Sequence, residues 1–126
     1  MLEITLPLPP RELSPNGRPH HLAKAKRVKE YRSESMMSAM CAVRDLGDSD
    51  SHGFPWLEAV IQIRWFAKTK SFPDADNALA SLKAAFDGLV DAGVLSDDRR
   101  VTYPPVEIAK DADWPRVELA ITRKET

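Results

Sequence analysis

The sequence predicts an α+β fold in which two main helices pack on a small mixed β-sheet. Short stretches of alternating apolar and polar residues occur near both ends and in the middle of the chain, which is typical of strands. Two longer segments repeat their apolar residues every three or four positions, which is typical of helices. These elements do not form repeated βαβ units, and their order therefore favours the α+β class.

The first half of the chain is expected to contain one strand and one long helix. Leu2, Ile4 and Leu6 alternate with polar residues, and the prolines between positions 7 and 10 end this strand. Residues 11–21 combine turn-forming and basic residues, which indicates a loop. A helix is expected from about residue 22 to residue 46, with Gly47 as its stop. Its apolar residues recur near helical spacing: Val28, Tyr31, Met36, Met40 and Val43. Four neighbouring sulfur-containing side chains are interpreted as helix packing: Met36, Met37, Met40 and Cys41.

The second half is expected to begin with the clearest strand, residues 56–67. Its apolar residues occupy one alternating set: Leu57, Ala59, Ile61, Ile63 and Trp65. A second helix follows and ends at Gly93. Its apolar stripe has three- and four-residue steps: Ala75, Ala78, Leu79, Leu82, Phe86, Leu89 and Val90. After a turn at residues 96–98, a weaker strand is expected near residues 106–108 and a clear one at residues 116–122.

Length and composition narrow the class of protein. A chain of 126 residues and 14.1 kDa is expected to form a single domain, residues 1–126. No apolar run approaches the roughly 20 residues of a membrane span, and the N-terminal residues do not resemble a secretion signal. We therefore expect a cytoplasmic protein with no membrane partner. The only cysteine, Cys41, excludes an internal disulfide and a structural zinc module that needs several thiolates.

Charge is unevenly distributed along the chain, although the net charge is only -1. Residues 11–32 contain seven basic residues and two glutamates, a net charge of +5. Residues 74–98 contain six aspartates and one lysine, a net charge of -5. One interpretation is a segment that binds a polyanion and a second segment that binds a divalent cation. The alternative is two ordinary solvated faces.

The acidic segment suggests a metal site. Asp74 and Asp76 open the second helix, where Asp74 can also cap the helix and Asp76 can complement its dipole. Asp97 and Asp98 follow the same helix across a turn, and a strand that leaves this turn could return beside the strand at residues 56–67. Three or four carboxylates would then converge, and Mg²⁺ would relieve their mutual repulsion.

Basic side chains suggest contacts with phosphate. Asp76, Lys83 and Asp87 are expected on one face of the second helix, because seven residues make nearly two turns, so Lys83 either contacts a phosphate or pairs with Asp87. Other candidates for contacts with a nucleic-acid backbone are Arg18, Lys24, Lys26, Arg27, Lys68 and Lys70. Tyr31 is interpreted either as a stacking partner for an unpaired base or as a core residue.

The segment Pro73 to Val101, PDADNALASLKAAFDGLVDAGVLSDDRRV, resembles the RusA family of Holliday junction resolvases. The opening strand, the basic loop after it and the closing strand at 116–122 resemble that family more weakly. The resemblance implies a small α+β homodimer, often encoded by phages and prophages, that uses Mg²⁺, with Mn²⁺ as a substitute. It matches the family's acidic residues to Asp74, Asp76 and Asp98 and its lysine to Lys83. This lysine lies three residues further from Asp76 than in the family pattern.

The resemblance implies a Mg²⁺-dependent endodeoxyribonuclease that resolves four-way DNA junctions by paired nicks during recombination and repair. Asp74, Asp76 and Asp98 would bind the metal, and Lys83 would add a positive contact. Two alternatives stay open: a DNA-binding or dimerisation protein without catalysis, and a metal-dependent nuclease for other branched nucleic acids. The near-neutral net charge would weaken DNA binding unless a dimer concentrates the basic segments.

Overall fold

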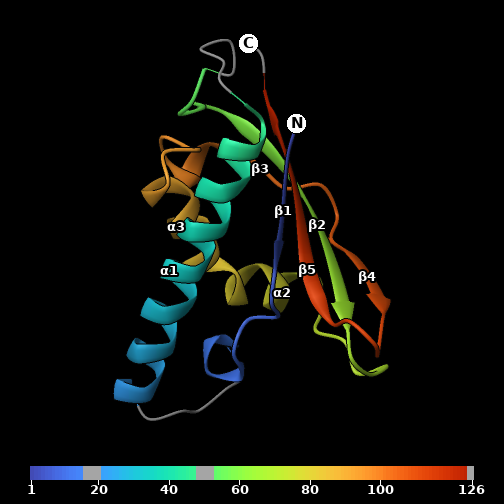
Figure 1. Ribbon diagram of the computed structural model, residues 1–126. Helices are drawn as coiled ribbons and strands as arrows, with labels where there is room; N and C mark the ends of the chain where they lie inside the picture. Colours follow the sequence, from blue (N-terminus) through green and yellow to red (C-terminus); the bar gives the residue numbers. More distant parts are fainter. Residues whose placement is uncertain (16–20, 48–52, 125–126) are drawn as a thin grey trace.

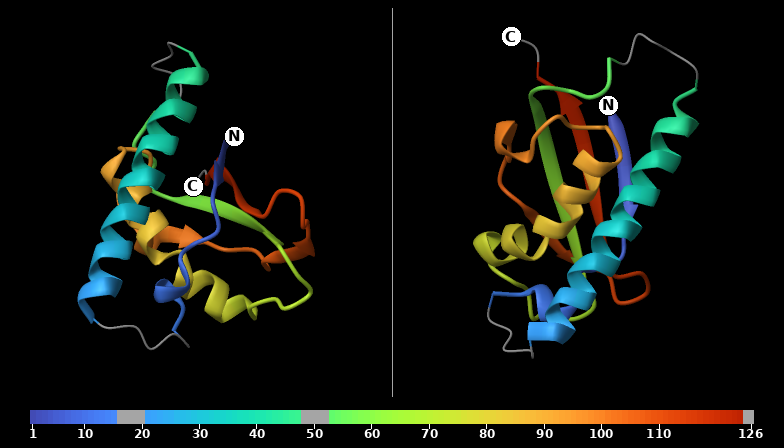
Figure 2. Two further views of the ribbon diagram at one scale, coloured as in Figure 1. Left: turned by 60° about the horizontal axis from the view of Figure 1, so that its bottom comes forward. Right: turned by 90° about the vertical axis from the view of Figure 1, so that its left-hand side faces the viewer.

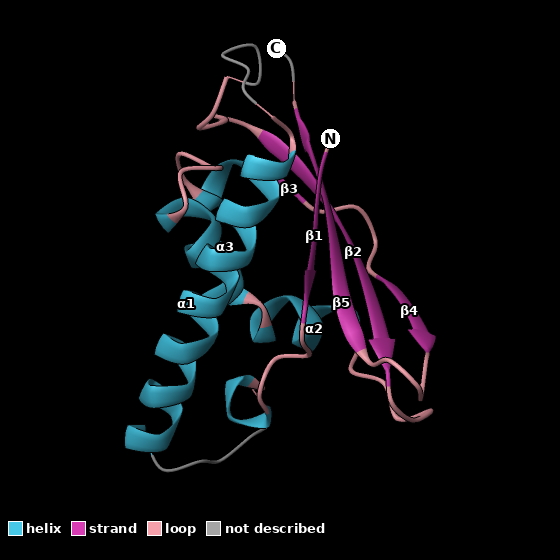
Figure 3. Ribbon diagram, viewed as in Figure 1, coloured by secondary structure: helices cyan, strands magenta, loops and turns pink. Residues whose placement is uncertain are grey.

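The computed structural model describes residues 1–15, 21–47 and 53–124, and it has a mixed five-stranded sheet with helices on one face (Figures 1 and 3). The strands are β1 (Leu2–Leu6), β2 (Ala59–Ala67), β3 (Val101–Thr102), β4 (Glu107–Lys110) and β5 (Arg116–Arg123). The α-helices are α1 (His21–Asp45), α2 (Ala75–Ser81) and α3 (Lys83–Asp91), and two short 3₁₀ helices are η1 (Arg11–Leu13) and η3 (Asp98–Arg100). The predicted combination of helices with a mixed sheet is confirmed.

The sheet is built around β2 and β5. β1 pairs antiparallel with β5, and β5 pairs antiparallel with β2. On its other side β2 pairs in parallel with two short strands, β3 near its beginning and β4 near its end. Side chains on the helix-covered face are buried in alternation along β1, β2 and β5, so the core lies between the sheet and the helices.

The long helix α1 packs along α3, and the two helices approach closely at Gly88 (Figure 2). A Cβ atom at Gly88 would lie 2.6 Å from the carbonyl oxygen of Arg32. The side chains of α1 that are buried here are Tyr31, Ser35 and Ala39. Two of these are small, and they allow the backbones of α1 and α3 to come together.

The packing predicted for three of the sulfur-containing side chains of α1 is wrong. Met37 and Met40 are 63% and 53% exposed, and Cys41 is exposed as well. The physical reason is the rotation of α1, because its narrow face of small residues, and not the methionine face, packs on α3. Only Met36 is partly buried.

The second predicted helix is divided into α2 and α3 at Leu82. Leu82 has φ -95° and ψ 3°, and its N–H donates to the Leu79 carbonyl oxygen at 3.1 Å, which is the bonding pattern of a 3₁₀ turn. The Leu82 side chain is fully buried. The turn at Leu82 lets α3 lie beside α1 while α2 extends toward the lower half of the sheet (Figure 1).

The predicted strand at residues 56–67 starts later, at Ala59, and Leu57 is exposed instead of buried. Trp56 forms an isolated parallel bridge with Leu95, so it contacts the segment after α3 before β2 begins.

In the described part of the chain, no helix is long and apolar enough to cross a membrane.

Candidate metal and nucleic-acid site

Asp74 caps the start of α2. Its Oδ1 accepts a hydrogen bond from the backbone N–H of Asn77 at 2.8 Å, and its carbonyl oxygen accepts from the N–H of Ala78 at 2.9 Å. The preceding segment 68–74 has no helix or strand and leads from the end of β2 into this cap. The structural role expected for Asp74 is therefore confirmed, and the exposed side chain keeps a second carboxylate oxygen outside this bond.

Asp76 lies in the first turn of α2 and is exposed. Its carboxylate forms no hydrogen bond or ion pair with any other residue that the structure describes. Two exposed carboxylates, two positions apart, fit the chemistry of Mg²⁺, which is often held by one or two carboxylates plus water and substrate phosphate. Asp74 and Asp76 therefore suit a divalent cation by their donor type.

The backbone of Asp98 lies at the opposite end of β2. Asp98 begins η3, which leads directly into β3, and Val101 of β3 pairs with Ala59 at the start of β2. The segment that leads to Asp74 leaves β2 after Ala67, and the eight residue steps between Ala59 and Ala67 span about 26 Å. Figure 1 shows β3 near one end of the sheet and α2 near the other.

The expected return of the chain beside β2 is confirmed, but the described part of the chain does not show the expected convergence of the acids. β3 does pair with β2, and because the pairing is parallel, the turn before β3 lies where β2 begins. Among the residues that the structure describes, no three or more His, Cys, Asp or Glu side chains are grouped to hold a metal ion. Asp97 accepts a hydrogen bond from the N–H of Arg99 at 2.9 Å and so caps η3.

Lys83 is the first residue of α3, and its Nζ lies 2.9 Å from Asp87 Oδ1. The ion pair that the sequence offered as one alternative is therefore present. The expected alignment of Asp76, Lys83 and Asp87 on one helix face is wrong, because the break at Leu82 puts Asp76 in a different helix. A contact between Lys83 and phosphate stays a prediction.

The basic candidates lie on α1 and on the segment after β2, toward the same end of the molecule as α2. Lys24, Lys26 and Arg27 are exposed in the first turns of α1, and Lys68 and Lys70 are exposed directly after β2. Figures 1 and 2 show that the start of α1, η1, α2 and the segment after β2 all lie toward one end. We call this region the basic end. Arg18 lies outside the described residues.

One basic side chain at the basic end, Arg27, is already partly neutralised. The Arg27 guanidinium lies 3.2 Å from Glu30 Oε2 and 3.9 Å from Glu12 Oε2. The four lysines at positions 24, 26, 68 and 70 form no ion pair with a described residue. These four lysines are therefore better placed than Arg27 to contact a phosphate backbone.

Tyr31 belongs to the core. Its side chain is buried, and its hydroxyl donates a hydrogen bond to the Pro7 carbonyl oxygen at 2.7 Å. Burial raises the pKa of the Tyr31 hydroxyl above its usual value. The interpretation of Tyr31 as a stacking partner for a base is wrong, because its ring is not accessible.

An exposed aromatic side chain that the sequence interpretation missed lies where β2 ends. The Arg116 guanidinium stacks between two rings, 3.9 Å from the centroid of Phe66 and 4.2 Å from that of Trp114. Arg116 also binds Asp111 at 2.8 Å and Glu118 at 2.9 Å. The hydrogen bond that Arg116 donates to Asp111 holds the pKa of the Asp111 carboxyl below its usual range. Trp114 stays 58% exposed. The sequence signal was a tryptophan in a polar turn, directly before a strand.

No protein-family model matches this chain. It is 33% identical over 113 residues to an uncharacterized protein of Xylella fastidiosa (strain Temecula1 / ATCC 700964), an alignment that covers 85% of this chain and 67% of that protein. At this identity and coverage, the chain belongs to the same protein family as the Xylella protein.

Proposed function

We propose that this protein is a Mg²⁺-dependent, structure-specific DNA endonuclease of the RusA type that acts on four-way junctions. The observation that carries the proposal is the position of Asp74 and Asp76, two exposed carboxylates at the basic end, where α1 and the segment after β2 also carry exposed lysines. The resemblance of the segment Pro73–Val101 to RusA resolvases supports the reaction and the substrate.

Different side chains would bind the metal and the DNA. Asp74 and Asp76 would hold the divalent cation, Mg²⁺ or in its place Mn²⁺. When bound, such a cation acidifies water and offsets the charge on the scissile phosphate. Lysines of the basic end would hold the DNA backbone in position without reading its sequence. Asp98 and Lys83 enter the proposal through the resemblance alone.

Two further parts of the proposal concern assembly and compartment. Paired nicks at symmetric positions favour a two-fold homodimer, because the same protein surface then meets each scissile strand. We place the protein in the cytoplasm, where its DNA substrate would be found in a bacterium.

A DNA-binding protein without catalysis is the second candidate. It is favoured by the partners that the acidic segment already has, since Asp74 caps α2, Asp97 caps η3 and Lys83 binds Asp87. These contacts explain much of the acidic segment without a metal. Asp76 has no such partner among the described residues, and its position in the first turn of α2, where it complements the helix dipole, is the structural role that this candidate leaves to it.

The test is an assay for cleavage of a synthetic, mobile four-way junction in the presence of Mg²⁺. The metal-free control is the same assay with EDTA. We expect paired nicks from the wild-type protein and a fall in cleavage rate of about 100-fold or more for Asp76→Asn, because a metal ligand is lost. Junction binding by Asp76→Asn should be retained or tighter, since one charge that repels phosphate is removed. The matched control is Asp113→Asn, which removes another exposed carboxylate and should cleave normally.

Each other outcome has a definite meaning. Full cleavage by Asp76→Asn contradicts the metal site. Tight binding without cleavage at several Mg²⁺ and Mn²⁺ concentrations supports the non-catalytic candidate. Faster cleavage of forks, flaps or three-way junctions than of four-way junctions would make the protein a nuclease for other branched nucleic acids.

A further inference from the structure

The outer edge of β1 is open. β1 pairs only with β5, so its other edge meets no strand in the part of the chain that the structure describes. The strand LEITL contains no lysine or proline, and its pairing with β5 runs without a bulge. Natural proteins often protect an exposed edge with a lysine, a proline or a bulge, because unpaired N–H and C=O groups can bind a strand from another chain. Glu3 is the one charged side chain on this short strand, so the edge is only weakly protected and points to a partner.

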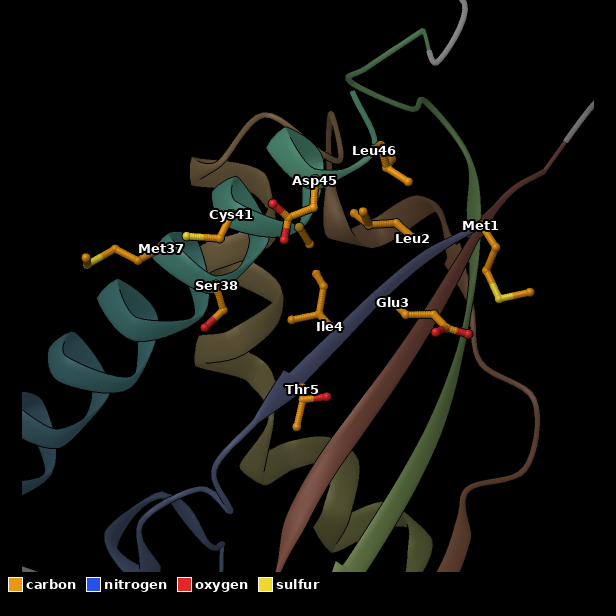
Figure 4. A pocket seen from close by; sticks show the side chains of 11 residues that line it. Met1, Leu2, Glu3, Ile4, Thr5, Met37, Ser38, Cys41, Asp45 and Leu46 are labelled. Carbon is orange, nitrogen blue, oxygen red and sulfur yellow. The ribbon is translucent and has the colours of Figure 1, made fainter. Parts of the chain in front are cut away.

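A groove lies along this edge. It has a volume of about 660 Å³ and separates β1 from the C-terminal half of α1 (Figure 4). Residues 1–5 form one wall, and α1 contributes Met37, Cys41 and Asp45 to the other. Met1 just before β1 and Met37 on α1 are among the most exposed apolar side chains of the described chain, and Cys41 is exposed one helical turn after Met37 (Figure 4). Exposed apolar surface of this kind marks an interaction site.

The groove does not suit nucleic acid. The charged residues that line it are Glu3 and Asp45, and neither lysine nor arginine lines it. Flexible methionines beside a strand edge instead suit a polypeptide, which would add main-chain hydrogen bonds at β1 and apolar contacts at α1.

We propose that the occupant is a second copy of this chain, with the two β1 strands paired antiparallel about a two-fold axis. This inference rests on the proposed function for the purpose of the dimer, and it names the surface on which the dimer forms. The two sheets would join into one continuous sheet, and the apolar residues of both α1 helices would approach across the axis.

The sequence of β1 is self-complementary in this arrangement. Antiparallel pairing centred on Ile4 puts Ile4 opposite its own copy and Leu2 opposite Leu6. Glu3 then lies opposite Thr5 on the other face, so no like charges meet in the new strand pair. A two-fold axis requires this property, because each copy presents the same surface to the other.

Strand pairing alone is too small for a stable dimer. Specific interfaces bury about 800 Å² on each partner, more than five paired residues supply. The exposed side chains of α1 must therefore contribute, and among the large apolar ones of α1 that line the groove Met37 is the most exposed. A charge at Met37 should consequently weaken the dimer.

The experiment is sedimentation equilibrium of the purified full chain over a wide concentration range, without DNA or divalent metal. We expect the wild type to shift from monomer to dimer, and Met37→Glu to raise the dissociation constant by about tenfold or more. The matched control is Met40→Glu. Met40 has similar exposure on the same helix but does not line the groove, so this variant should dimerise like the wild type.

A second measurement uses Cys41, the only cysteine of the chain. In the wild type its alkylation rate should fall as the protein concentration rises through the dimerisation range. A rate that does not change with concentration overturns the proposal, and so do equal dissociation constants for Met37→Glu and Met40→Glu. A monomer at every concentration also overturns it, and an extended segment of another protein then becomes the candidate occupant. A dimer that cuts no DNA contradicts the proposed function alone.

Discussion

At the scale of single residues, Gly88 determines how closely α1 and α3 pack. The position of a Cβ atom at Gly88 lies 2.6 Å from the Arg32 carbonyl oxygen and 3.0 Å from the Met36 nitrogen, both of which are backbone atoms. A side chain at this position can be accommodated only if one of the helices moves. The neighbouring buried Ser35 hydroxyl has no hydrogen-bond partner among the described residues, so it is enclosed without contributing a polar contact.

Gly88→Ala should therefore destabilise the protein, by about 1–3 kcal/mol, because it overpacks the helix crossing. Helix propensity alone predicts the opposite sign, a gain of about 1 kcal/mol from replacing glycine inside a helix. Urea denaturation of both proteins distinguishes the two. Ser35→Ala serves as the control at the same crossing, and its free energy of unfolding should not fall, since the hydroxyl it removes is unpaired. A Gly88→Ala variant more stable than the wild type would contradict the close packing of α1 and α3.

Sequence patterns predicted some residue environments and not others. The alternation along β1 and β2 predicted the buried faces correctly, because a strand offers only two faces to its side chains. The long helix offers several overlapping stripes, and hydrophobicity favoured Met37 and Met40 over Ser35 and Ala39. The choice between these stripes depends on what lies opposite, and Gly88 is more than forty residues away in the sequence. Such a contact leaves no local pattern.

At the scale of elements, one ion pair joins α1 to α3. Arg32 binds Asp91 through two hydrogen bonds, including one of 2.8 Å from Nη2 to Oδ1. The hydrogen bond from Arg32 is the main cause that lowers the pKa of the Asp91 carboxyl below its ordinary value of 3.8. A carboxyl whose pKa is lower in the folded state stabilises that state at pH values above its unfolded pKa. This contribution is lost as the pH falls through the lowered pKa.

Asp91→Asn should therefore reduce the free energy of unfolding at neutral pH, and the difference from the wild type should shrink as the pH falls below 3.8. Urea denaturation of both proteins at pH 7 and at acidic pH measures this difference. Asp113→Asn is the control, because this exposed carboxylate forms no ion pair with a described residue. A deficit of Asp91→Asn that is the same at every pH would show that the charge of Asp91 does not contribute.

The arrangement of elements explains why the acidic site was only partly predictable. Asp74 and Asp76 are positioned by the local start of α2, which the sequence indicated directly. The position of Asp98 depends on where β3 pairs with β2, and a parallel pair puts the beginnings of both strands at one end. The two-residue strand β3 has no periodic pattern that could reveal its pairing. The break at Leu82 likewise falls inside an apolar stripe that continues across it, and α3 after the break packs against α1.

At the scale of the whole molecule, the position of charge matters more than its sum. The net charge of -1 gives no reason to expect DNA binding, yet exposed lysines occur on the start of α1 and on the segment after β2, which lie on two sides of the basic end. The opposite end has basic residues as well, including Arg44 near the end of α1 and Lys124 after β5. Two variants that remove equal charge from the two ends can therefore separate position from net charge.

Lys24→Gln combined with Lys26→Gln and Arg44→Gln combined with Lys124→Gln each change the net charge from -1 to -3. Only the first pair should weaken junction binding strongly. If both lysines contact phosphate, the slope of log affinity against log salt concentration should fall in magnitude by about 1.8, because each contact releases about 0.9 counterions. Fluorescence anisotropy with a labelled junction at several salt concentrations, with EDTA present to prevent cleavage, gives both quantities. Equal losses for the two double variants would mean that net charge governs binding, and the basic end would then have no special role.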